Sequence, residues 1–410
     1  MTRSVLTLFA IGFLSLGVVG CSKKDPAPAP AELKSIEAQG DSAGTSTETA
    51  VTKEQAEAFA QQLSTAISSG DTAAAGRLIL SSRILDRVVS GLQLTGTDAA
   101  GFRRGMQSND PLKNIVSQLA NSVGQGGSYL LVRTAVRGGE MHAIFRLLDV
   151  NQSLNYHDFR LVMDGGTVKA DQMFVAATGE SIADTLITSI GPTIRSQQSL
   201  SGKLTGEAAQ KLKDLKQQGE LMKAVQSGNP TEALRIYEGL PSEMKDSKAV
   251  QLARVMASQG LTNDQYMAAM TDYANRFPND PSVALMLFDR AVLKKDVDAV
   301  KECMVSLDQW TGGDDYLNLL AASVVSQWGA FEYAKELYTN ADPAKIGTAM
   351  AHDHKLSAAL RCKDNSVVLA ELRILRDEFD MDFSLEGQEL FADFVKTPQF
   401  QTFQSESKSE

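Results

Sequence analysis

The sequence predicts an α+β domain, in which helices pack on a curved antiparallel sheet, followed by an all-α array of helical repeats. Near residue 130 the spacing of apolar residues changes from the three-to-four-residue period of helices to the two-residue period of strands. Two Gly-Gly pairs then interrupt the strand-like stretches where hairpin turns are needed. Beyond residue 205 the pattern is helical again, and turn signals recur at a constant interval.

Four helices are expected before the sheet. Thr52 has the side chain of a good N-cap, and apolar residues follow it at four-residue spacing from Phe59 to Ile67. Gly70 and Asp71 are suited to ending this helix and beginning the next. The expected helices cover 53–69, 72–79, 82–89 and 111–122.

The first expected hairpin turns at Gly138 and Gly139, and pairing Arg137 with Glu140 sets its register. One face of the two strands is then apolar. It carries Leu130, Val132, Thr134, Val136, Met141, Ala143, Phe145 and Leu147. The opposite face is polar and carries Tyr129, Arg133, Arg137, His142 and Arg146.

A second hairpin is expected to turn between Asp164 and Thr167. Arg160 is expected opposite Asp171 on its polar face, as a cross-strand pair of opposite charges. Because both hairpins have one apolar and one polar face, they predict a sheet with helices packed on one side. The expected apolar face of this hairpin carries Phe159, Leu161, Met163, Val168, Ala170 and Phe174.

The strands of this second hairpin resemble a known family. Residues 156–160 (YHDFR) and 172–180 (QMFVAATGE) look like the last hairpin of NTF2-like, or cystatin-like, domains. In that family an aromatic-rich strand leads to a Gly-Glu pair and a closing helix. The resemblance implies an NTF2-like α+β fold for 53–200. Members of the family include enzymes, ligand binders and interaction modules, so this fold leaves the function open.

The region 205–410 contains a repeated turn pattern. A turn residue is followed five residues later by a small Ala, and four residues further on by an aromatic side chain. The pattern occurs twice, at Gly228, Ala233 and Tyr237 and at Gly329, Ala334 and Tyr338.

The spacing of the turns indicates the kind of repeat. Lys295 and Lys363 lie at equal distances in sequence before and after Gly329. This interval resembles that of the tetratricopeptide repeat (TPR), a pair of helices with a period of about 34 residues. The resemblance implies four to five repeats, each burying its apolar face against its neighbours, with a cap at 391–403.

Residues 1–20 have the parts of a secretory signal, because a positive charge precedes an apolar run too short to span a bilayer comfortably. The run ends in VVGC at 18–21, which resembles the lipobox of bacterial lipoproteins. The resemblance implies cleavage before Cys21 and its acylation, with palmitate among the expected chains, since one chain alone binds a membrane only marginally. In lipoproteins of Gram-negative type, an Asp directly after the acylated Cys favours retention in the inner membrane. Residue 22 is Ser, so the resemblance implies the periplasmic face of the outer membrane.

The segment 21–52 is rich in Ala, Pro, Ser and Thr, and it is expected to be a disordered stalk. The expected organisation is therefore a signal peptide at 1–20, the stalk at 21–52, the α+β domain at 53–200 and the repeats at 205–410.

Charge and motifs exclude several functions. From Glu207 to the end there are 22 Lys+Arg and 32 Asp+Glu, whereas residues 1–206 hold 18 of each, so nucleic acid is not an expected partner. The sequence has no zinc motif, nucleophile elbow, Walker loop or dinucleotide fingerprint. We therefore expect no enzyme activity, no cofactor and no metal. Cys303 and Cys362 lie two repeats apart, so a disulfide between them is not expected.

The four histidines are natural candidates for chemistry. His142 shares the predicted polar face with Arg133 and Arg146, and the three could line a pocket for an anionic ligand. The alternative is that they lie on the solvated back of the sheet. His157 falls on the apolar face of its strand and is expected in the core. His352 and His354 are two residues apart on a helix, point in different directions, and are expected on the surface.

Helical repeats usually bind partners along the concave groove formed by the first helix of each repeat. A mixed apolar and acidic groove would suit a protein segment, although Tyr316 could instead pack between repeats. The expected groove residues are Leu285, Asp289, Tyr316, Leu319, Ser323, Gln327, Asp353, Ser357 and Arg361.

The expected function is a membrane-anchored, non-enzymatic scaffold whose repeats bind another envelope protein. A ligand receptor or enzyme centred on the α+β domain is the first alternative. A subunit of an envelope assembly or secretion complex is the second.

Overall fold

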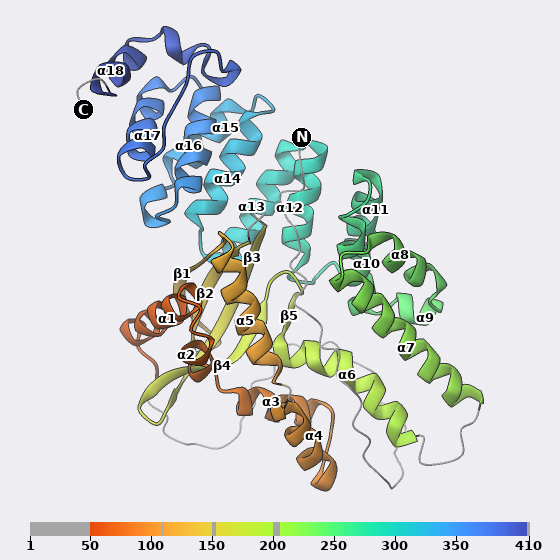
Figure 1. Cartoon of the computed structure of the whole chain (residues 1–410). Helices are drawn as coiled ribbons and strands as arrows, with labels where there is room; N and C mark the ends of the chain where they lie inside the picture. Colours follow the sequence, from red (N-terminus) through yellow and green to blue (C-terminus); the bar gives the residue numbers. More distant parts are fainter. Residues whose placement is uncertain (1–49, 109, 150–152, 200–205, 408–410) are drawn as a thin grey trace. The chain divides into compact units, whose positions relative to one another are not determined.

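The computed structural model describes residues 50–108, 110–149, 153–199 and 206–407. It divides into two compact units, one ending at Val283 and one beginning at Ala284. The first unit contains an antiparallel sheet and helices, and the second is helical (Figure 1). The coarse prediction of an α+β part followed by an all-α part is therefore confirmed. The division between the units lies later in the chain than the expected boundary at 200–205.

The expected helices before the sheet correspond to the first, second, third and fifth helices of the structure. Thr52 caps the first helix, because its hydroxyl accepts the amide hydrogen of Gln55 and the Gln55 side chain accepts that of Thr52. The fourth helix was not expected, since three glycines lower its helix propensity. These helices are α1 (Lys53–Ser68), α2 (Thr72–Arg77), α3 (Ser81–Gly91), α4 (Gly96–Ser108) and α5 (Pro111–Gly124).

The sheet is an antiparallel meander in which each strand pairs with the next along the chain. Arg137 pairs with Glu140, and Asp164 pairs with Thr167, so both predicted turns are confirmed. All four turn glycines have φ between 56° and 85°, which two-residue hairpin turns of this kind require. The strands are β1 (Ser128–Arg137), β2 (Glu140–Leu148), β3 (Leu154–Asp164), β4 (Thr167–Val175) and β5 (Glu180–Ser181).

A bulge in β1 changes the expected faces of this strand. The register follows the prediction from Arg137 to Arg133 and shifts between Arg133 and Leu131. Beyond the bulge Tyr129 pairs with Leu147 on the apolar face, where it is buried against Phe145 with 4.9 Å between ring centroids. The bulge has this effect because one extra residue moves each side chain farther from the hairpin turn to the opposite face of the sheet. The polar face predicted for Tyr129, and the apolar face predicted for Leu130, which pairs with Arg146, are wrong, and Val132 is the extra residue of the bulge.

A second bulge lies between β3 and β4, where the register shifts between Arg160 and Leu161. Beyond it Met173 lies opposite Phe159, and Phe174 lies opposite Asp158 on the other face. The apolar position predicted for Phe174 is therefore wrong. The apolar face is covered by α1, whose Phe59 ring lies 6.4 Å from that of Phe159.

More helices complete the first unit. Among those that follow the sheet, α7, α8 and α10 share a core built around Leu221, Ala233, Ile236 and Val250, and α11 packs on α10. They are α6 (Ile182–Ser199), α7 (Gly206–Gln226), α8 (Pro230–Gly239), α9 (Ser242–Lys245), α10 (Lys248–Ser258) and α11 (Asn263–Arg276).

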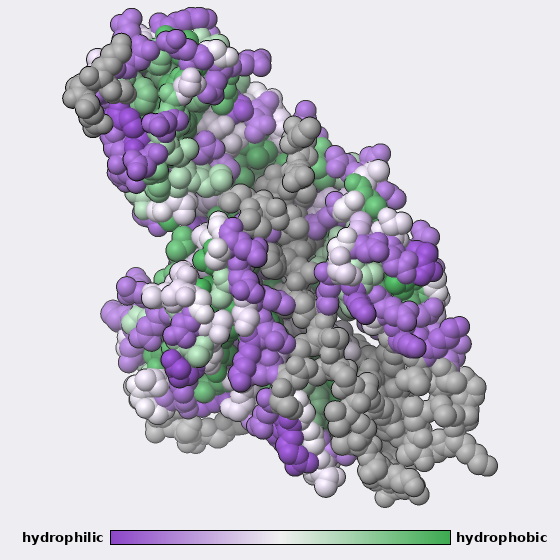
Figure 2. Space-filling model, viewed as in Figure 1, coloured by the Kyte–Doolittle hydropathy of each residue, from purple (hydrophilic) through white to green (hydrophobic). Residues whose placement is uncertain are grey.

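The second unit consists of further helix–turn–helix segments and a C-terminal cap. The cap contains two 3-10 turns and a helix that packs on α17, and it buries Phe391, Phe394, Phe400 and Phe403. The helices are α12 (Val283–Lys294), α13 (Val297–Thr311), α14 (Asp315–Ser326), α15 (Phe331–Thr339), α16 (Ala349–Arg361), α17 (Asn365–Asp377) and α18 (Pro398–Ser407). On the visible face of this unit, hydrophilic residues dominate the rim and hydrophobic residues gather toward the middle (Figure 2).

The turn positions deduced from the constant interval share one backbone conformation. Lys295, Gly329 and Lys363 have φ of 55°, 84° and 56°, each between two successive helices. Gly228, between α7 and α8, has φ of 64°. A left-handed residue of this kind ends one helix and reverses the chain into the next. Ala233 and Ala334, five residues after their turns, are completely buried.

Candidate functional site

The predicted groove is not an exposed surface at most of its positions. Tyr316, Leu319, Leu285 and Asp289 are all buried to 1% exposure or less, and Ser323 is also buried. The reason is the position of α14, which contacts α13, α15 and α16 and has buried residues all around its circumference. Of the other predicted groove positions, Gln327 and Asp353 are exposed, whereas Ser357 and Arg361 are half-buried and hydrogen-bonded to each other at 2.5 Å.

Tyr316 has the environment of a packing residue. Its hydroxyl lies 3.3 Å from His354 Nε2, and the two rings meet edge to face with centroids 5.5 Å apart. A side chain in this position joins α14 to α16 and is not available as an anchor for a partner. The alternative that Tyr316 packs between repeats is thus the one that the geometry favours.

The second predicted site, on the polar face of the sheet, does bring Arg133, His142 and Arg146 to one face. Arg133 pairs with Ile144, which lies between His142 and Arg146 on β2. A buried carboxylate shares this face: Asp158 Oδ1 lies 2.7 Å from His142 Nδ1, and its Oδ2 accepts a hydrogen bond from Arg137. His142 is therefore already paired with an anion, which weakens the case for an anion-binding pocket.

A further ionic network ties the same sheet to a helix. Arg160 binds Asp171 through two hydrogen bonds of 2.9 Å and 3.0 Å, and Arg87 of α3 lies 2.7 Å from the same carboxylate. Arg160 also lies 3.2 Å from Glu140. The predicted contact of Arg160 with Asp171 is confirmed, although the bulge makes it diagonal. Since its charges satisfy one another, this network has the character of a structural tie.

His157 is in the core, as expected. It is buried and its Nδ1 lies 3.1 Å from the Tyr129 hydroxyl, and burial lowers its pKa to about 3. A histidine that stays neutral at physiological pH and is enclosed in this way has a packing role.

The surface position expected for the other two histidines is wrong. His352 is 2% exposed, and its Nδ1 lies 2.6 Å from Glu371 Oε2. Lys355 lies 3.8 Å from the other oxygen of Glu371. His354 is half-buried against Tyr316, and burial lowers its pKa to about 4. Both sides of α16 are covered because α14, α15 and α17 all pack on it.

One cluster that the sequence did not reveal joins the sheet to the helices after it. Lys248, at the start of α10, lies 2.5 Å from Asp280 and 3.3 Å from Glu180, and donates to the Gly179 carbonyl at 3.1 Å. Asp280 in turn accepts hydrogen bonds from the backbone and hydroxyl of Ser282, at 2.9 Å and 2.6 Å. Burial raises the pKa of Glu180. Lys248 and Gly179 are 69 residues apart, so no local pattern could indicate the contact.

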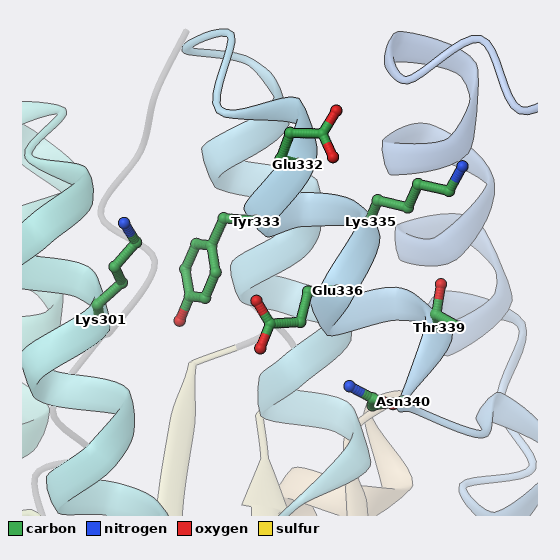
Figure 3. Close-up of a pocket in the computed structure, with 7 residues that line it drawn as sticks. All are labelled: Lys301, Glu332, Tyr333, Lys335, Glu336, Thr339 and Asn340. Atoms are coloured by element: carbon green, nitrogen blue, oxygen red, sulfur yellow. The ribbon is translucent and has the colours of Figure 1, made fainter.

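A shallow cleft of about 580 Å³ opens on the second unit, between α13 and α15 (Figure 3). Tyr333 and Glu336 project from α15 toward α13, while Lys335 points away from them (Figure 3). The Nζ of Lys301, on α13, lies 5.2 Å from the centre of the Tyr333 ring, which is a cation–π contact. The lining is completed by Glu332, Thr339 and Asn340.

Acidic groups surround the aromatic ring of this cleft. Burial, Glu336 and Asp308 together raise the pKa of Tyr333 to about 12. Asp308 has one carboxylate oxygen that is buried without a hydrogen-bond partner. Within the part of the chain that the structure describes, neither Glu332 nor Glu336 has an ion-pair partner. The cleft lies on the second helices of the repeats, whereas the groove predicted from the sequence lies on the first helices.

No protein-family model, curated protein or solved structure matches this chain. Over the described residues no group of three or more His, Cys, Asp or Glu side chains is arranged to hold a metal ion. The helices in those same ranges include none that is long and apolar enough to cross a membrane. Cys21, the signal and residues 21–49 of the predicted stalk lie outside the described residues.

Proposed function

We propose that this chain is a lipid-anchored, non-enzymatic lipoprotein of the cell envelope whose helical repeats bind another envelope protein. On this proposal the repeats are of the TPR type, and the α+β domain is an NTF2-like module that either docks a partner or holds a small ligand. The observation that carries the proposal is the recurrence of left-handed turns at the equally spaced positions Lys295, Gly329 and Lys363. Repeated helix pairs of this kind form extended surfaces suited to protein recognition.

The binding surface is assigned to the α13/α15 cleft, because the residues predicted for the concave groove are mostly buried. Val305, one helical turn from Lys301 on α13, is 58% exposed beside this cleft. An exposed apolar side chain next to a half-buried tyrosine and charged groups has the composition of a recognition surface with a polar rim.

The test is site-specific crosslinking in cells. A photoreactive amino acid at Val305 is expected to capture one or a few envelope proteins. The same residue at Val136, which is 66% exposed on the β1–β2 hairpin, serves as the matched control. Equal capture at both positions, or none at Val305, would refute the assignment of binding to the repeats.

The membrane anchor has its own test. The Cys21→Ser variant should lose lipid labelling and remain uncleaved by the lipoprotein signal peptidase, because the sulfur that carries the diacylglyceryl group is missing. Lipid labelling that persists in the variant would exclude Cys21 as the modified residue.

A further inference from the structure

The α13/α15 cleft has the features of a site for a positively charged side chain. Tyr333 offers the face of an aromatic ring, and Glu332 and Glu336 flank it on the same helix. Aromatic faces attract cations, and carboxylates form short charge-assisted hydrogen bonds with them. The two kinds of group together favour a lysine or arginine of a partner.

The chain itself supplies evidence that a cation is stable at this position. Lys301 places its ammonium group 5.2 Å from the centre of the Tyr333 ring. It also lies 3.3 Å from Asp298, so its charge has an alternative partner on its own helix. An incoming cation could displace Lys301 from the ring without leaving that lysine unpaired.

The charge around the cleft points to the same partner. Of the net charge of −10, a net −9 falls on residues 284–410, which contain 13 Lys+Arg and 22 Asp+Glu. A negative surface raises the association rate of a basic partner and disfavours an acidic one. Two acidic side chains of the cleft, Glu332 and Glu336, have no ion-pair partner among the described residues and are exposed.

We propose, building on the repeat-mediated protein binding above, that the α13/α15 cleft binds an arginine side chain from an exposed basic segment of the partner. The guanidinium stacks on Tyr333 in place of the Lys301 ammonium and hydrogen-bonds to Glu336. Arginine is preferred to lysine because its planar group stacks on an aromatic ring and binds a carboxylate through two parallel hydrogen bonds.

The test uses the purified full-length lipoprotein in neutral detergent and fluorescein-labelled Gly-Ser peptides. One peptide carries arginines, and the controls carry citrulline, a neutral analogue of similar shape, or aspartate. Fluorescence anisotropy should show binding of the arginine peptide that is at least about tenfold tighter than that of the citrulline peptide. Tighter binding of the aspartate peptide would overturn the proposal, since Lys301 and Lys335 would then be the recognition groups.

Matched variants separate the cleft from the general negative charge of the unit. Glu332→Gln with Glu336→Gln should weaken binding of the arginine peptide about tenfold. Glu386→Gln with Glu389→Gln removes the same charge from exposed positions of the same unit and should have little effect. Equal effects of the two double variants would overturn the proposal. Melting temperatures of all variants are measured alongside, so that a folding defect is recognised.

A change of Lys301 tests whether this lysine competes with the partner's arginine for the Tyr333 ring. Lys301→Gln should tighten binding of the arginine peptide several-fold, because the internal competitor for Tyr333 is gone. Lys396→Gln changes the net charge equally at an exposed site away from the cleft and should tighten it less. If the two variants behave alike, Lys301 is not a competitor. Crosslinking at Val305 without arginine selectivity would leave the proposed function standing and refute only the arginine site.

Discussion

Gly179 should be one of the most sensitive positions of the first unit. It has φ of +64°, and a Cβ added there would lie 2.9 Å from Asp280 Cγ and 3.1 Å from the Ser282 amide nitrogen. The Asp280 carboxylate is not free to move away, because Lys248 holds it at 2.5 Å and Ser282 at 2.6 Å and 2.9 Å. Gly179→Ala therefore combines backbone strain with the disruption of this cluster.

A matched control sets the magnitude of this effect. Gly228 has the same φ of +64°, lies in the same unit and has nothing within 4 Å of an added Cβ. Gly228→Ala should cost about 1 kcal/mol, for left-handed backbone strain alone. Gly179→Ala should cost about 3–4 kcal/mol, since weakening the charged hydrogen bonds of Asp280 adds about 2–3 kcal/mol. Each Gly→Ala change also lowers the conformational entropy of the unfolded chain. This effect is the same in both variants and cancels when their free energies of unfolding are compared.

The assay uses the positions of the tryptophans. Both Trp residues of the chain, Trp310 and Trp328, lie in the second unit, so their fluorescence reports its unfolding, whereas far-ultraviolet circular dichroism reports both units. In urea, Gly179→Ala should lower the midpoint of a circular-dichroism transition and leave the fluorescence transition in place. If the two alanine variants differ by less than about 1 kcal/mol, the Asp280 cluster does not restrain this position.

Three further predictions concern buried residues. The folded pKa of His157 is about 3 and its ordinary value is 6.5, so the unfolded state binds an extra proton below pH 6.5. The free energy of unfolding should therefore be unaffected by His157 above pH 6.5, and it should fall by up to about 1.4 kcal/mol per pH unit as the pH drops toward 3. A His157→Gln variant whose stability declines equally steeply would contradict this. His352→Ala removes the partner that lies 2.6 Å from the buried Glu371, leaving Lys355 at 3.8 Å. It should cost about 3 kcal/mol in the fluorescence transition, the lower end for breaking a buried pair because Lys355 remains nearby, and an unchanged midpoint would count against the pair. Tyr316→Ala should cost about 3–5 kcal/mol in the same transition as a core truncation; lost crosslinking at Val305 with an unchanged melt would instead restore Tyr316 as a binding residue.

Much of the secondary structure could be predicted because its causes are local. The Thr52 cap and the two Gly-Gly turns depend on residues next to one another in the chain, and these were predicted correctly. The turns at Lys295 and Lys363 were predicted from their equal spacing about Gly329. Lysine has no intrinsic preference for the left-handed conformation that both residues adopt, so their place in the repeat, and not their residue type, indicated these turns.

The candidate sites were less predictable, because exposure depends on neighbours that are distant in sequence. Tyr316 and Asp289 occupied positions expected to face a groove, yet both are fully buried. The pairing of His352 with Glu371 involves residues on two helices, and nothing near His352 in the sequence indicates it. The α13/α15 cleft could have been suspected only from the aromatic and charged residues that begin α15.

The sequence by itself determined the order of helices, strands and turns, the change from an α+β part to an all-α part, and the acidity of the C-terminal half. These properties arise from residue spacing, local capping and composition. Tertiary structure alone decided which residues face the core in 128–131 and 172–175, because one extra residue in a strand reverses the face of every side chain farther from the hairpin turn. It also decided where the chain divides, since Lys248 pairs with Glu180 and Asp280 across a distance in sequence that no local pattern spans.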